Sequence, residues 1–159
     1  ESARFEAGRP EGAFAVALVL LVVVSMTGAI TALGDTLFPT EATLGPGLFA
    51  KVESDLSAAN HFLIRLRALH PLIAVFGALY LLWLLAPGAT ARGGGWARFG
   101  LIAVGAQTLV GLANIALAAP GWIQLVHLAF AHAVWIATLM AALEAAPAAR
   151  VAPARIAHA

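Results

Sequence analysis

The chain has 159 residues, of which 62% are hydrophobic and only 11% are charged, and its mean hydropathy is +0.92. Soluble domains usually carry about 25% charged residues, so this composition excludes an ordinary water-soluble globule. The net charge of +1 is too balanced to indicate a nucleic acid as a partner. Because the chain has no cysteine, disulfides, iron–sulfur clusters and thiolate metal sites are excluded as well.

Long stretches without Asp, Glu, Lys or Arg predict the fold. Residues 12–34 and 68–91 form two such stretches of 23 and 24 residues, and residues 99–143 form one of 45. A membrane-spanning helix needs about 20 residues, and Pro120-Gly121 is typical of a turn that divides the longest stretch. We therefore predict an all-α membrane protein with one four-helix transmembrane domain over residues 1–159. The helices are expected at about 13–33, 61–85, 97–118 and 122–144.

The basic residues predict how the helices are oriented. Six of the nine precede the first helix, join the second to the third or follow the fourth, and cytoplasmic segments are enriched in such residues. The 34–60 loop is acidic and should face the outside. The prediction is an up-down-up-down bundle in the cell membrane with both termini cytoplasmic. The first residue is Glu rather than Met, so two expectations stay open: a piece of a longer polypeptide or a complete four-helix protein. The six basic residues on the predicted cytoplasmic side are Arg4, Arg9, Arg92, Arg98, Arg150 and Arg155.

Small and polar residues occur at intervals along the predicted helices. Glycine and alanine allow membrane helices to approach closely, and this packing role alone explains them. For Gln107 and Asn114 we expect hydrogen bonds across the bundle. The small residues are Gly28, Ala32, Gly77, Ala78, Gly105 and Gly111.

His70 and His127 are the candidate ligands for a cofactor. Each lies a few residues into a helix that starts at the outer side, so the two imidazoles should be within about 5 Å of the same depth. Ionisable groups inside a bilayer are costly and indicate function. Equal depth on two parallel helices suits one ion or one haem held between them. The alternative is two separate histidines that each bond to helix backbone.

The remaining donors favour haem over a bare metal ion. No intramembrane carboxylate, cysteine or suitably placed methionine is present to complete a zinc or copper site. A porphyrin already supplies four nitrogens, and two histidines complete six-coordinate iron. Arg65 and Arg67 precede His70 toward the outer surface and could pair with the haem propionates. Alternatively, they extend toward lipid headgroups.

The other features near these histidines receive smaller roles. His61 should lie near the outer surface on the opposite face of its helix from His70. His132 is about 140° around the helix from His127, and we interpret it as a polar residue lining the bundle rather than a ligand. Pro71 removes a helix hydrogen bond to the carbonyl of Arg67, so a kink is expected beside His70.

Three segments together resemble the C-terminal half of the haem A synthase family, over most of residues 14–144. They are TGAITALGDTLFP (27–39), HFLIRLRALHP (61–71) and APGWIQLVHLAFAHAVWIA (119–137). Members of that family have two related four-helix halves and convert a methyl group of haem O to the formyl group of haem A. Their substrate-binding half has Glu three residues before its first histidine and paired cysteines. This chain has Arg67 at that position and no cysteine.

The resemblance implies a haem b held between His70 and His127. Arg65 and Arg67 stay candidates for the propionates on their position alone, and we expect no catalytic residue in this chain. It implies electron transfer that supports oxidation of haem O bound in a partner half or subunit. Further expected partners are the lipid bilayer, a haem O synthase and terminal oxidase assembly. Two other functions stay open: a non-catalytic membrane haem-binding or assembly protein, and a small membrane scaffold without a cofactor.

Overall fold

The computed structural model describes residues 11–38, 57, 61–91 and 94–146, and this part of the chain is helical with no strand. Four segments within it are long and apolar enough to cross a bilayer: Gly12–Leu37, Phe62–Ala89, Gly95–Ala116 and Gly121–Ala145. The predicted all-α architecture with four membrane spans is therefore confirmed. The helices are α1 (Glu11–Leu37), α3 (Phe62–Arg67), α4 (Leu69–Ala89), α5 (Gly95–Ala116) and α6 (Gly121–Ala145).

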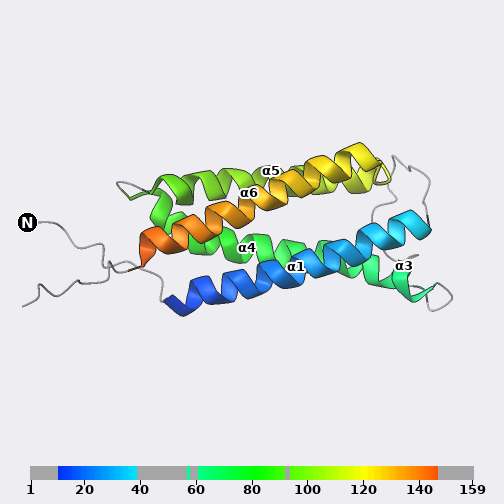
Figure 1. Ribbon diagram of the computed structural model, residues 1–159, viewed down its shortest axis with the longest axis horizontal. Coiled ribbons are helices and arrows are strands. Elements are labelled where there is room, and N and C mark those ends of the chain that lie inside the picture. The colour runs from blue at the N-terminus through cyan, green and yellow to red at the C-terminus, as the bar shows by residue number, and fades with distance from the viewer. Residues whose placement is uncertain (1–10, 39–56, 58–60, 92–93, 147–159) are drawn as a thin grey trace, which may run out of the picture.

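The four long helices form a bundle in which successive spans run in opposite directions (Figure 1). Around the bundle, α1 contacts α4, α4 contacts α5, α5 contacts α6, and α6 returns to α1. We call the end formed by Leu37, Phe62 and the turn at 117–120 the hairpin end. The opposite end, formed by Glu11, Ala89 and Ala145, is called the core end.

The second span is two helices rather than the single helix expected at 61–85. The short α3 stops at Arg67, Ala68 separates it from α4, and the N–H of Ala68 bonds to the carbonyl of Leu66. Pro71 lies one turn further on and has no N–H with which to continue the ladder to Arg67. The interruption thus lies beside His70, where Pro71 predicted a kink.

The first helix continues one turn beyond its expected end at residue 33. It reaches Leu37, so residues 34–37 of the expected outer loop are helical and place Asp35 inside the last turns of α1. The remainder of that loop, apart from Phe38 and Ser57, lies outside the described residues. A charged residue marks a polar environment, not the end of a helix, and here Asp35 is stabilised by an ion pair described below.

The turn between α5 and α6 is short and uses a left-handed backbone. Ala118 and Ala119 have φ angles of 56° and 54°, a conformation that costs an L-residue roughly 1–2 kcal/mol. The N–H of Ala119 bonds to the carbonyl of Asn114 at 2.7 Å, and the amide of Gln124 bonds to the carbonyl of Ala119 at 2.6 Å. These bonds hold the start of α6 against the end of α5, which fixes which residues of the two helices face each other.

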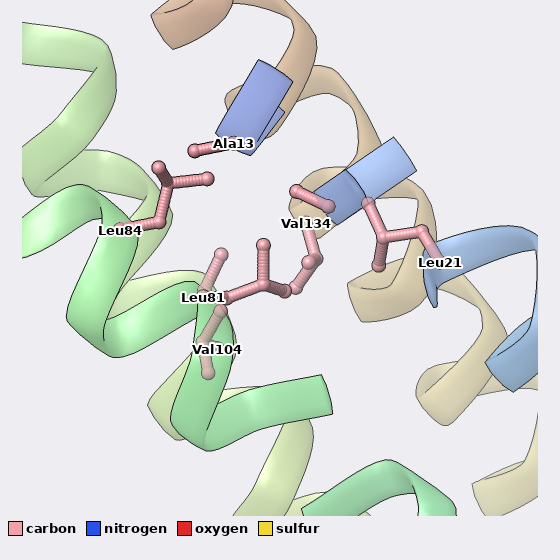
Figure 2. Close-up of a cluster of buried hydrophobic side chains, with 8 residues drawn as sticks. Ala13, Leu21, Leu81, Leu84, Val104 and Val134 are labelled. Atoms are coloured by element: carbon pink, nitrogen blue, oxygen red, sulfur yellow. The ribbon is translucent and has the colours of Figure 1, made fainter. Parts of the chain in front are cut away.

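The buried apolar side chains gather in the half of the bundle toward the core end. Leu81 and Leu84 of α4 meet Val104 of α5, Val134 of α6 and the first turns of α1 (Figure 2). A second cluster of Leu85, Ala97 and Ala141 lies beside Trp96. The first cluster consists of Ala13, Ala17, Leu21, Leu81, Leu84, Ala103, Val104 and Val134.

Small residues allow close helix approach at some of the expected positions and not at others. A Cβ atom on Gly77 would lie 3.2 Å from the Val24 side chain, so this glycine does bring α4 close to α1. Gly105 was expected to do the same, but a Cβ there would meet nothing within 4 Å. Gly100 performs that role on α5, since its Cβ would lie 2.7 Å from Leu85 Cδ1.

Candidate functional site

His70 is held against α1 near the hairpin end. The hydroxyl of Thr27 donates its one hydrogen to the carbonyl of Val24 at 2.9 Å, and the same oxygen lies 3.1 Å from Nδ1 of His70. Thr27 must therefore accept a hydrogen from Nδ1. With the proton on Nδ1, the lone pair of His70 is on Nε2. This is the tautomer that metal-binding histidines adopt when a second group orients them.

His127 has the same tautomer in a different environment. The side-chain nitrogen of Gln107 on α5 lies 3.2 Å from Nε2 of His127 and donates to it. The proton of this imidazole is therefore also on Nδ1, which is buried and has no hydrogen-bond partner. In both histidines Nε2 is thus the unprotonated ring nitrogen, and in His127 its lone pair accepts the Gln107 hydrogen bond.

Each imidazole packs on a glycine of the preceding span. A Cβ atom on Gly28 of α1 would lie 3.1 Å from Cε1 of His70, and one on Gly111 of α5 would lie 3.1 Å from Cε1 of His127. Any larger residue would displace the ring. We expected both glycines to serve helix packing only, whereas the structure places the histidine rings on them.

The two histidines lie toward the same end of the bundle. Both are in the half toward the hairpin end, His70 on α4 and His127 on α6. The described residues contain no group of three or more His, Cys, Asp or Glu that could hold a metal ion. Two imidazole nitrogens match what a haem iron requires, because the macrocycle supplies its other four ligands.

Unpaired buried polar atoms gather on the same side. Among the described side chains, the buried nitrogen and oxygen atoms without a partner are Gln107 Oε1, Asn114 Oδ1 and His127 Nδ1. Gln107, Gly111 and Asn114 recur every three to four residues and so share one face of α5. The expected cross-bundle hydrogen bond is confirmed for Gln107. Leaving polar atoms buried without partners is costly, so their concentration here makes this end of the bundle the candidate site.

The structure separates the two arginines that were grouped in the sequence. Arg67 is buried, its guanidinium lies 3.4 Å from an Asp35 carboxylate oxygen, and it donates to the carbonyl of Phe38 at 3.1 Å. It therefore does not extend toward headgroups. Arg65 is exposed. The Asp35–Arg67 pair joins the end of α1 to α3, and Arg67 lies three residues before His70. The extension of α1 past residue 33 makes this pair possible.

The other described histidines lie outside the site. His61 caps α3 by accepting the N–H of Leu63 at 3.3 Å, and it contacts the rings of Phe38 and Phe62. His132 was expected to line the bundle, and that expectation is wrong: the side chain is exposed, and its Nδ1 donates to the carbonyl of Leu128 at 2.7 Å. It lies on the face of α6 opposite the buried positions. His158 is outside the described residues.

Comparison with known proteins gives the chain a family context. Residues 2–139 match the model of the COX15-CtaA family, described as cytochrome oxidase assembly protein. Two curated proteins named protoheme IX farnesyltransferase, from two strains of Thermus thermophilus, are 44% and 43% identical over 138 residues. The match covers 80% of this chain but 22% of each relative, so the chain spans about a fifth of their length. No solved structure matches the chain.

Proposed function

The chain belongs to the COX15-CtaA family of cytochrome oxidase assembly proteins, and on this premise we propose that it is the haem b-binding half of a haem A synthase. The observation that carries the proposal is the pair of histidines with Nε2 lone pairs, each packed on a glycine, in a multi-pass membrane protein. A haem bound there supplies one-electron transfer.

The chain's own residues hold and orient the group. His70 and His127 would hold the haem iron, and Thr27 keeps the His70 ring in its ligating tautomer and increases its basicity by accepting a hydrogen bond from the Nδ1 N–H. Gly28 and Gly111 leave room for the rings. Exposed Arg65, with buried Arg67 two residues further on, would place positive charge near the two propionates at the hairpin end.

We propose electron transfer rather than oxygen chemistry for this chain. Two histidine ligands would leave no open position on a haem iron. The methyl group of haem O is therefore oxidised in a partner half or subunit, and this chain delivers or removes electrons. Arg67 stands three residues before His70, where the substrate-binding half of the family has Glu, and this agrees with the same division of labour.

The relatives indicate the proposed partner. Two of them are named for farnesyl transfer to protohaem and are about five times as long as the matched segment. Farnesylated haem is haem O, the expected substrate of the partner half. We therefore place the chain in a membrane assembly that forms haem O, converts it to haem A and passes it to terminal oxidase assembly.

The proposal is tested on protein purified from membranes of cells that make haem. Organic extraction and chromatography should recover haem b, and the optical spectrum should be that of six-coordinate low-spin iron. A colourless protein with no extractable haem overturns the proposal and favours a scaffold without cofactor. Bound haem, with no haem A formed after the partner half, haem O, a reductant and O₂ are added, favours a non-catalytic haem-binding protein.

A further inference from the structure

Gln107 contacts the nitrogen of His127 that the proposed ligation requires. Its amide nitrogen lies 3.2 Å from Nε2, so the lone pair that would bind iron is already accepting a hydrogen bond. A single lone pair serves one partner at a time. Gln107 and iron therefore compete for His127.

The equivalent bond on the other side has the opposite effect. Thr27 contacts Nδ1 of His70, the nitrogen away from the ligating position, so its bond and an Nε2 ligand are compatible. The two histidines thus differ in how ready Nε2 is to bind iron. His70 is oriented as it would be when coordinated, whereas His127 is oriented by a partner that has to leave.

We propose that Gln107 is a positioning residue that holds His127 while the ring is uncoordinated and releases it on haem binding, which makes His127 the exchangeable axial ligand and His70 the fixed one. This inference rests on the function proposed above. On ligation, the Gln107 N–H···Nε2 hydrogen bond breaks and the Nε2–iron bond forms. The Nδ1 proton stays in place, and no electron moves.

The side chain of Gln107 is suited to this exchange. It comes from α5, one turn before the glycine on which the His127 ring packs, so it reaches the ring edge without moving either helix. Its Oε1 is buried and unpartnered even in the bonded state. The side-chain amide of Gln107 is thus weakly anchored. The hydrogen bond to the imidazole is the one that the structure shows for this amide, and ligation of His127 breaks it.

The test compares haem titration of the haem-free wild-type protein with Gln107→Leu and Gln107→Met, which remove the donor and keep the bulk. Removing a competitor strengthens binding, and a net hydrogen bond corresponds to about a 3- to 10-fold change. Both variants should therefore bind haem about 3- to 10-fold more tightly. Thr27→Val should bind it more weakly, because His70 loses its orienting acceptor.

A second readout separates competition from loosening of the fold. Carbon monoxide binds ferrous haem in the position that a histidine vacates, and in the wild type Gln107 captures the released His127. The Gln107 variants should therefore bind carbon monoxide more weakly by the same factor that haem binding improves. General loosening would weaken haem binding and strengthen carbon monoxide binding instead.

Thr108→Val is the matched control, because Thr108 is an exposed neighbour on α5 whose hydroxyl bonds to Val104 of its own helix. It should change neither measurement. If the Gln107 variants bind haem no more tightly than the wild type, or if carbon monoxide binding does not fall, the inference is wrong although the haem site stands. If the wild-type protein binds no haem, the proposed function fails and the inference with it.

Discussion

The core-end half and the hairpin-end half of the bundle are built from the same four helices but are filled by different side chains. Toward the core end, leucine, valine and alanine interlock, and Tyr80 and Thr138 bond to carbonyls of Ala13 and Val134. Toward the hairpin end, two histidines rest on glycines, and three buried polar atoms among the described residues have no partner. The core-end half is packed by its own side chains, whereas the hairpin-end half has the composition of a binding site.

This difference teaches where stability and function are located. Packed apolar contacts hold membrane helices together without a ligand. Polar atoms that the protein itself does not satisfy indicate a group supplied from outside. Substitutions in the two halves should therefore separate cleanly, with effects on stability from one and effects on haem binding from the other.

The largest stability effect is expected in the packed half. Leu84 is 2% exposed, and Leu84→Ala should cost about 2–5 kcal/mol because it leaves a cavity among four helices. Leu79 on the same helix is 58% exposed, so Leu79→Ala should stay within about 0.5 kcal/mol. Unfolding in detergent measures both. Equal effects of the two changes would contradict the assignment of the core.

A larger residue at Gly111, on which the His127 ring packs, should weaken haem binding. Gly111→Val places atoms where the imidazole lies, and overpacking of about 1–3 kcal/mol corresponds to roughly 5- to 150-fold weaker haem binding. Gly105→Val is the control on the same helix, because a Cβ there meets nothing within 4 Å. Haem titration distinguishes them. Undiminished binding by Gly111→Val would show that the ring does not need this glycine.

The buried ion pair between α1 and α3 should have an intermediate effect on stability. Arg67→Gln removes the positive charge beside the partly buried Asp35 carboxylate and should cost about 1–3 kcal/mol. Adding Asp35→Asn should recover part of that loss, since the carboxylate charge is then removed as well. The measurement is the free energy of unfolding of the two single variants and the double variant. Strictly additive losses would mean that the two residues do not interact.

The smallest effect is expected at His132, which is exposed on α6 and bonds only to its own helix among the contacts that the structure describes. His132→Ala should leave the haem spectrum unchanged and haem affinity within about twofold. Loss of a low-spin spectrum in this variant would place a ligand on the opposite face of α6.

The sequence predicted the spans well because a bilayer imposes both length and apolar composition, and it predicted the break near His70 because Pro71 lacks an N–H. It did not predict the extension of α1, since Asp35 was interpreted as loop and its partner Arg67 is distant in sequence. Glycine alone does not reveal whether it faces a helix or a ring, so the roles of Gly28 and Gly111 required the structure. The exposure of His132 depends on which face of α6 the other helices cover, and periodicity in a helix apolar all round does not reveal that.

The central claim is that His70 and His127 share one haem iron, and the optical spectrum of haem-loaded single variants tests it most directly. The wild type and His61→Ala should show a six-coordinate low-spin spectrum, because both axial positions are filled by imidazoles. His70→Ala and His127→Ala should each give a five-coordinate high-spin spectrum or no bound haem. A low-spin spectrum that survives in either of these two variants would contradict the account.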